Sequence, residues 1–209
     1  MRISTFPSSI NLPKSKKEKT KSAMDAIVPT IVEIVTEEDL IKTVQNFCWS
    51  PFIFSGTRKQ ENFQSCDFAV LDIDEGLSID EAEVIVNNLE LTCLCTVSTS
   101  HTPENHRFRL IFPLLRTITK VEEYVATMTK LAESFPTTDR ACLHDTARLF
   151  FSSTTEDGFW VEAGFLKVET PTIIAKQRYS SDNGVQVKVD MSLQEIVKEL
   201  YGSERSTIR

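Results

Sequence analysis

Two aspartates lie close together at the end of an apolar run, in the segment FAVLDIDEG, residues 68–76. Because successive side chains of a strand point to opposite faces, we expect Asp72 and Asp74 to share one face while Ile73 turns into the core. Two carboxylates on one face repel each other unless a cation or a proton lies between them. The pair is therefore predicted to bind a cation or to take part in acid-base chemistry. Removal of either carboxylate is expected to leave the metal-free fold at least as stable.

A second polar group occurs in STSHTPENHRFRLIFPL, residues 98–114. A turn that contains Ser100 and His101 precedes Arg107 and Arg109, which a strand would place on one face. A guanidinium binds phosphate through two parallel hydrogen bonds, and hydroxyl and imidazole groups add single donors. This set predicts a site for a phosphorylated ligand.

A third carboxylate follows in FPTTDRACLHDTARLFF, residues 135–151, where Asp139 and Asp145 are the candidates. We favour Asp139, because Asp145 and Thr146 resemble a turn or cap that positions Arg148. Three aspartates holding two divalent ions, beside donors for a triphosphate, are the groups that in-line nucleotidyl transfer requires. Arg148 is a further candidate for contact with the nucleotide phosphates.

The elements that must position these residues alternate between strand and helix patterns. Helices are predicted within residues 36–47, 78–89 and 119–135, with side-chain caps from Thr36 and Asp39, Ser78 and Glu81, and Thr119 and Glu122. Strands are predicted at residues 27–35, 51–56, 68–73, 91–98, 107–114, 148–152 and 159–169. This order, with one hairpin-like pair, favours an α/β or α+β sheet layered with helices.

Composition restricts the possible functions. The 209 residues carry a net charge of −7, which argues against nonspecific coating of nucleic acid through bulk charge. Apolar residues occur in short runs, with no membrane span and no apolar N-terminal signal. The five irregularly spaced cysteines are typical of reduced core thiols in a cytoplasmic protein. A zinc site from Cys93, Cys95, Cys142 and His144 is the alternative.

Three segments are predicted along the chain. Residues 1–22 are interpreted as a disordered lysine-rich tail whose run from Lys14 to Lys21 tunes affinity for nucleic acid. Residues 23–170 form the core. Residues 171–209 are predicted to be a polar linker followed by an amphipathic helix over residues 191–202.

At these motifs the sequence resembles the archaeo-eukaryotic primase superfamily, especially the small primase-polymerases of phages and plasmids. Asp72 and Asp74 match its acidic metal motif, and Asp139 matches its last metal ligand. Ser100 and His101 match the motif whose histidine contacts the incoming nucleotide. The motifs occur in the family's order, each within a strand or loop context that fits.

The resemblance covers residues 50–155 and has departures. The family's second motif has a hydroxyl residue two positions before the histidine, which would make Thr99 the hydroxyl partner and leaves Ser98, Thr99 and Ser100 without assigned roles. The sequence GTR that ends at Arg58 is similar to the family's glycine-x-arginine before the acidic strand. A zinc-binding stem and a helicase phosphate loop are absent from the sequence.

The resemblance implies an α+β catalytic core with an RRM-like mixed sheet, packed helices and an N-terminal αβ layer. It implies DNA primase or primase-polymerase activity with two Mg²⁺ or Mn²⁺ ions, a single-stranded DNA template, NTP or dNTP substrates and a separate helicase. The expected setting is the cytoplasm of a bacterial or archaeal host, with a phage or plasmid as the source of the gene. The metal ligands would be Asp72, Asp74 and Asp139, the nucleotide contacts Ser100, His101, Arg107, Arg109 and Arg148, and the template contacts Arg58 and Lys59.

Two other function classes use similar residues. A metal-dependent nuclease or replication initiator would also cluster acids and histidines, but a relaxase requires a histidine pair separated by one apolar residue. His101, His106 and His144 do not form such a pair. A nonenzymatic nucleic-acid-binding module with the same fold is the second alternative.

Overall fold

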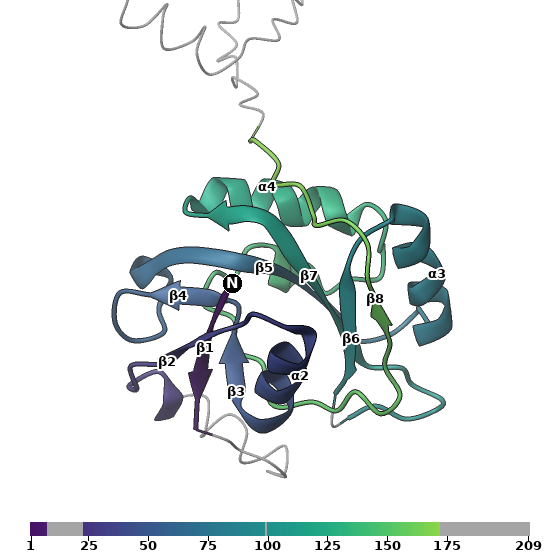
Figure 1. Cartoon of the computed structure of the whole chain (residues 1–209), viewed down its shortest axis with the longest axis horizontal. Coiled ribbons are helices and arrows are strands. Elements are labelled where there is room, and N and C mark those ends of the chain that lie inside the picture. Colours follow the sequence, from purple (N-terminus) through teal and green to yellow (C-terminus); the bar gives the residue numbers. More distant parts are fainter. Residues whose placement is uncertain (8–22, 99, 172–209) are drawn as a thin grey trace, which may run out of the picture. The chain divides into compact units, whose positions relative to one another are not determined.

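The computed structural model describes residues 1–7, 23–98 and 100–171, and these form two antiparallel sheets (Figure 1). The three-stranded sheet has the order β2-β1-β3, from Thr30–Glu33, Arg2–Phe6 and Cys48–Ser50. The five-stranded sheet has the order β4-β5-β7-β6-β8, from Phe52–Phe54, Phe63–Ile73, Phe108–Ile118, Cys93–Val97 and Trp160–Val161. The predicted α+β fold class, with an N-terminal αβ layer, is confirmed. The predicted mixed sheet is wrong, because all pairs of named strands are antiparallel.

Two of the three helix caps that the sequence predicted are confirmed. Thr36 and Asp39 form a capping box before α2, Glu37–Asn46, and Ser78 and Glu81 form another before α3, Ile79–Leu89. The predicted Thr119 cap of α4, Val121–Ala132, is wrong. The N-cap is Lys120, which makes no side-chain cap bond, because β7 runs to Ile118 and leaves Thr119 one position too early. Two short 3₁₀ helices, η1 (Gln60–Asn62) and η2 (Arg140–Leu143), complete the described helical elements.

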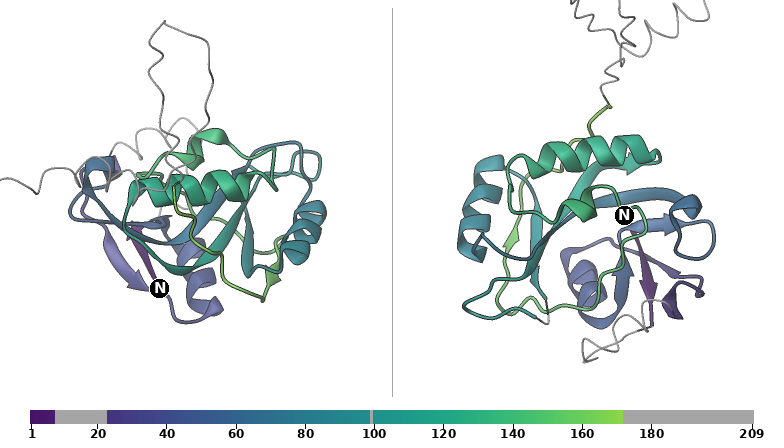
Figure 2. Two further views of the ribbon diagram at one scale, coloured as in Figure 1. Left: turned by 90° about the horizontal axis from the view of Figure 1, so that it is seen from above. Right: turned by 180° about the vertical axis from the view of Figure 1, so that it is seen from behind.

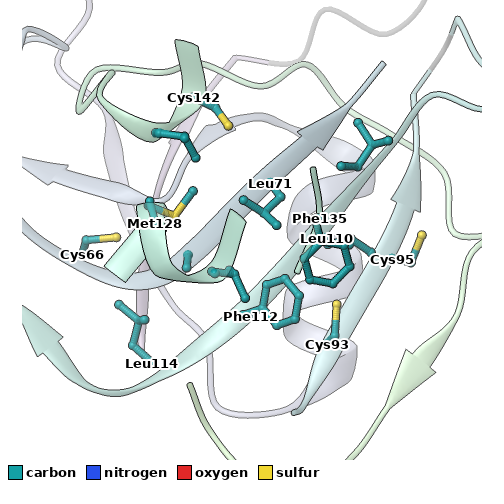
Figure 3. Close-up of a cluster of buried hydrophobic side chains, with 14 of the residues drawn as sticks. Cys66, Leu71, Cys93, Cys95, Leu110, Phe112, Leu114, Met128, Phe135 and Cys142 are labelled. Carbon is teal, nitrogen blue, oxygen red and sulfur yellow. The ribbon is translucent and has the colours of Figure 1, made fainter. Parts of the chain in front are cut away.

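The five-stranded sheet is covered on both faces (Figure 2). One face packs against α3 and α4, and Figure 3 shows this apolar cluster around Leu71, Leu110 and Phe112. The other face packs against the three-stranded sheet and α2, where Phe68 and Ile111 belong to a second cluster with residues of the N-terminal layer. The sheet is therefore the middle layer, and charged residues on it need partners wherever a covering layer approaches.

Residues 2–6 correct the predicted N-terminal boundary near residue 23. They form β1, the central strand of the smaller sheet, with Ile3 and Phe6 buried in the core. The sequence signal was missed because Ser4 and Thr5 interrupt the apolar pattern. Both are buried on a strand that is paired on each side. The lysine run from Lys14 to Lys21 and the helix predicted at residues 191–202 lie outside the described residues.

Of three predicted strands, two are much shorter than expected and one is absent. Residues 27–35 yield only β2, and residues 159–169 yield only β8 and isolated bridges. Residues 148–152 form no strand and pair only through the bridge between Trp49 and Phe150. Apolar composition alone therefore overestimates strand length here, since these segments pack their side chains without forming a backbone ladder.

The thiols are buried, as predicted. All five cysteines are buried, and burial raises the pKa of Cys95 to about 12 and that of Cys142 to about 11. Within the described ranges, no three His, Cys, Asp or Glu side chains gather as a metal site, so the zinc alternative finds no support. No helix in the described part of the chain is long and apolar enough to cross a bilayer.

Candidate functional site

Asp72 lies near the end of β5, on the face that carries Phe68 and packs against the N-terminal layer. Its neighbour across the ladder is Arg109 of β7. The Nε of Arg109 lies 3.3 Å from Asp72 Oδ1, which is an ion pair without the alignment of a hydrogen bond. Arg109 Nη1 donates to the carbonyl of Phe151 at 3.0 Å. The alternation of β5 and β7 therefore brings the predicted carboxylate and guanidinium together.

Asp139, the N-cap residue of η2, lies close to Asp72. Its backbone N–H donates to the carbonyl of Asp72 at 2.9 Å, so this backbone contact holds the start of η2 against the end of β5. One carboxylate oxygen of Asp139 caps η2 by accepting from the N–H of Ala141. The other, Oδ2, lies 2.7 Å from Arg148 Nη2. The same nitrogen lies 2.9 Å from Asp72 Oδ2, so Asp72 and Asp139 converge on one cation.

Asp145, the competing third carboxylate, has a different task. Its Oδ1 accepts the N–H of Ala147 at 3.0 Å, and its carbonyl accepts the N–H of Arg148 at 3.2 Å. It therefore forms the turn that orients Arg148, in line with the sequence preference for Asp139. Arg148 is nevertheless paired with carboxylates in this structure, an arrangement that the sequence did not predict.

Asp74 stands apart from this convergence. Its carboxylate lies 3.2 Å from Arg107 Nη2, and its backbone carbonyl accepts from Arg107 Nε at 3.4 Å. The side chain is half exposed, whereas that of Asp72 is only 16% exposed. The expected unshielded repulsion between Asp72 and Asp74 is therefore wrong, because each carboxylate pairs with its own arginine from β7 or its edge.

The donor set fits one divalent ion better than two. Asp72 and Asp139 offer the carboxylate oxygens that Mg²⁺ and Mn²⁺ prefer, and Arg148 already stands in for a cation between them. Asp74 is directed to Arg107, and the described residues contain no assembled group of three ligands. A three-aspartate, two-ion centre would require Asp74 and the arginines to rearrange.

An aromatic side chain supports the two arginines beside Asp72. The Cζ of Arg109 lies 5.0 Å from the ring centroid of Phe150, and that of Arg148 lies 6.0 Å from it. The ring itself packs against Trp49. Burial alone would lower the pKa of Arg148, but the charges and hydrogen bonds of Asp72 and Asp139 outweigh it and raise that pKa above its ordinary value. Arg148 is therefore a permanently charged part of this site.

His101 and Ser100 lie in the turn between β6 and β7. The N–H of His101 donates to the carbonyl of Ser98, and its Nδ1 accepts the N–H of Arg107 at 3.2 Å. The N–H of Ser100 donates to Ser98 Oγ. Ser98 therefore shapes the turn, while Thr99 lies outside the described residues. His101 is therefore a turn residue whose imidazole is also hydrogen-bonded to the backbone of Arg107.

His106 is a functional candidate that the sequence analysis did not assign. Its ring packs edge-on to His101, with centroids 5.2 Å apart, and its Nδ1 accepts the N–H of Ile79 at the start of α3. His106 therefore connects the turn that contains His101 with the N-terminal end of α3. The sequence could have indicated this role, because His106 lies between the predicted turn and Arg107.

The two predicted template contacts, Arg58 and Lys59, differ in their exposure to solvent. Arg58 is buried, and its guanidinium donates to the carbonyl of Ala147 and to Asp25, so the template role does not fit it. Its residue type suggested phosphate binding, but its side chain points inward and fixes the backbone beside Arg148. Lys59 is exposed, 3.7 Å from Glu61, and stays available.

The comparison with family models matches the VapE N-terminal domain over residues 18–178. The chain belongs to the VapE N-terminal domain family. This membership supports the resemblance to phage-type primase-polymerase cores that the motifs indicated. No curated protein sequence matches the chain.

One solved structure with similarity to this VapE N-terminal domain is the AEP domain of the cyanophage S-2L primase-polymerase. The two chains share 8% identity with a TM-score of 0.40, over 73% of this chain and 72% of that chain.

Proposed function

We propose that this domain catalyses template-directed nucleotidyl transfer, as a DNA primase or primase-polymerase core in the replication of a phage or other mobile element. The observation that carries the proposal is the convergence of Asp72 and Asp139 on one cation, Arg148 Nη2. Arg109 on the neighbouring strand β7 forms an ion pair with Asp72. Carboxylates that hold cations beside guanidinium groups are the parts that phosphoryl and nucleotidyl transfer require.

The carboxylates would bind metal ions, and the arginines would bind the phosphate groups of the nucleotide. Asp72 and Asp139, joined by Asp74 after a side-chain movement, would hold Mg²⁺ or Mn²⁺. Two such ions, if bound after that movement, would neutralise charge on the triphosphate and activate the primer 3′-hydroxyl. Arg107 and Arg109 would exchange their carboxylate partners for phosphate oxygens, which offer the same bidentate geometry.

His101 would contribute a single donor. Its Nδ1 accepts a backbone N–H, so the neutral imidazole carries its proton on Nε2 and presents a donor there. Such a donor suits a phosphate oxygen of the incoming nucleotide. Ser100 lies beside it in the same turn and would add a hydroxyl contact.

The remaining proposed partners are nucleic acid and protein. A single-stranded DNA template would contact Lys59 and the lysine run, with a separate helicase supplying that strand. Both NTP and dNTP are candidate substrates. The setting that the family resemblance implies, the cytoplasm of a bacterial or archaeal host, stays part of this proposal.

Metal-dependent nucleotide binding tests the proposal. A fluorescent dNTP is titrated with the full chain in the presence and absence of Mn²⁺, and then with His101→Ala. We expect binding that depends on Mn²⁺ and that weakens by about 1.5–3 kcal/mol in the variant, the range for a hydrogen bond to a charged group. Binding of single-stranded DNA should stay unchanged in the variant. Equal losses for nucleotide and template would assign His101 to turn formation only.

A nonenzymatic nucleic-acid-binding module is the second candidate. The observation that favours it is the pairing of Asp72, Asp74 and Asp139 with arginines, which leaves no assembled group of three metal ligands among the described residues. For such a module, template binding would be independent of Mn²⁺, and no nucleotide would bind.

A further inference from the structure

Arg148 occupies the position between Asp72 and Asp139 where a divalent cation would bind. A single nitrogen, Nη2, lies 2.9 Å from one carboxylate oxygen and 2.7 Å from the other. Both oxygens are the Oδ2 atoms, which leaves Asp139 Oδ1 to cap η2 and Asp72 Oδ1 to face Arg109. A metal ion that used both aspartates in this arrangement would need the oxygens that Arg148 now contacts.

The backbone that carries Arg148 is fixed, whereas its side chain is partly exposed. Asp145 accepts the N–H groups of Ala147 and Arg148, and Arg58 donates to the carbonyl of Ala147. The side chain of Arg148 is 21% exposed, compared with 10% for Arg109. Displacement of the Arg148 guanidinium therefore needs only side-chain rotation about a held backbone.

Besides its ion pair with Asp72, the guanidinium of Arg109 donates a hydrogen bond to the carbonyl of Phe151. The two arginines differ in this respect, because no hydrogen bond from Arg148 to a backbone carbonyl anchors its guanidinium within the described contacts. Among the described contacts, the hydrogen bonds of the Arg148 guanidinium are therefore those to Asp72 and Asp139, and a cation that binds these carboxylates replaces both of them.

We propose that Arg148 is a built-in competitor of the metal ion: its guanidinium holds Asp72 and Asp139 together in the metal-free protein, and a divalent cation displaces it. The displaced guanidinium would then have lost both carboxylate partners and would be available to an anion. Arg148 is in this role a positioning residue that couples cation binding to the availability of an anion-binding group. The inference rests on the proposed function for its choice of cation, but the competition is measurable without nucleotide.

Direct measurement of Mn²⁺ binding to the full chain tests the competition. Free Mn²⁺ is followed by electron paramagnetic resonance for the unmodified protein, for Arg148→Gln and for Arg116→Gln. The Arg116 variant makes the same charge change at an exposed pair with Glu123 and controls for bulk electrostatics. We expect Arg148→Gln to bind Mn²⁺ about tenfold more tightly, since a charge-assisted contact no longer competes, and Arg116→Gln to change affinity by less than about twofold.

Stability separates competition from a purely structural role. Without metal, Arg148→Gln should unfold at a lower temperature than the unmodified protein, and Mn²⁺ should raise its unfolding temperature by more. Arg148→Lys, which keeps the charge without the planar fork, should show intermediate Mn²⁺ affinity and serves if the glutamine variant does not fold. Unchanged or weaker Mn²⁺ binding in folded Arg148→Gln and Arg148→Lys overturns the inference, as does an absence of Mn²⁺ binding in all variants.

The outcomes keep this inference apart from the proposed function. Competition for Mn²⁺ without any nucleotide incorporation would uphold the inference and reject the polymerase activity. Nucleotide incorporation with equal Mn²⁺ affinity in the unmodified protein and Arg148→Gln would do the reverse.

Discussion

The two faces of β5 end differently. Toward α3 and α4 the strand presents Leu71 and Ile73, both fully buried in one apolar cluster. Toward the N-terminal layer it presents Phe68 and then Asp72, where arginines take the place of apolar neighbours. At the end of the strand, one face is thus stabilised by apolar burial and the other by ion pairs.

This difference separates two kinds of dependence. Apolar burial is nondirectional, so apolar substitutions that keep the volume usually cost less than about 1.5 kcal/mol. The charged end depends on matched partners, because removal of one charge leaves another partly buried without compensation. Substitutions on the apolar face should therefore affect stability alone, and those at the charged end should affect stability and ligand binding together.

The apolar face should give the largest loss of stability. Phe112 is fully buried and packs near Phe135 in the cluster covered by the helices. We expect Phe112→Ala to lower the free energy of unfolding by about 3–5 kcal/mol, through lost burial and the cavity that remains. Urea denaturation measures it, with Leu115→Ala, at an exposed position of the same strand, as the control. A loss no larger than that of the control would place Phe112 outside the core.

Substitution of Arg58 should give the next largest loss of stability, since Arg58 is a buried charge outside the ion pairs of Asp72 and Asp139. Arg58→Met should lower the free energy of unfolding by about 2–3 kcal/mol, because the carbonyl of Ala147 and the carboxylate of Asp25 lose a charged donor. The salt dependence of single-stranded DNA binding should not change. A flatter salt dependence with full stability would restore the template role that the sequence suggested.

The two aspartates of the first motif should differ from each other. We expect Asp72→Asn to cost about 2 kcal/mol, because Arg109 and Arg148 lose their shared partner. Asp74→Asn should cost less than about 1 kcal/mol, because the pair with Arg107 is half exposed. Thermal unfolding without metal compares the two variants directly. Equal or increased stability of Asp72→Asn would revive the repulsion expected from sequence.

Lys59 should give the smallest effect. Lys59→Met removes an exposed charge, so the free energy of unfolding should change by less than about 0.5 kcal/mol. If the residue contacts a template phosphate, the slope of log affinity against log salt for single-stranded DNA should become about 0.7 less steep. An unchanged slope would remove Lys59 from the template surface.

The sequence predicted the parts of the site that follow from local patterns. Strand alternation was enough to predict that Asp72 and Asp74 share one face of their segment and that Arg107 and Arg109 share one face of theirs. The two capping boxes marked α2 and α3 because their hydrogen bonds are local. The position of Asp139 beside Asp72 came from the family resemblance. Nothing local encodes the backbone bond that joins them.

The parts that the sequence missed depend on contacts between distant segments. Arg58 and Arg148 have the same residue type, yet one points inward to Ala147 and Asp25 while the other reaches two carboxylates. β1 was overlooked because Ser4 and Thr5 read as polar, whereas burial of such residues is possible on a strand paired on both sides. Charge and polarity identify candidates, and only the fold selects their partners.

Nucleotide incorporation on a primed single-stranded template tests the central claim most directly. The full chain is assayed with Mg²⁺ or Mn²⁺ beside Asp139→Asn and Asp145→Asn, which make the same chemical change nine and three residues before Arg148. We expect metal-dependent incorporation that falls about a thousandfold in Asp139→Asn, since several kcal/mol of charge stabilisation are lost, and that persists in folded Asp145→Asn. Absence of incorporation by the unmodified chain, or equal losses in both variants, would contradict a catalytic pair formed by Asp72 and Asp139.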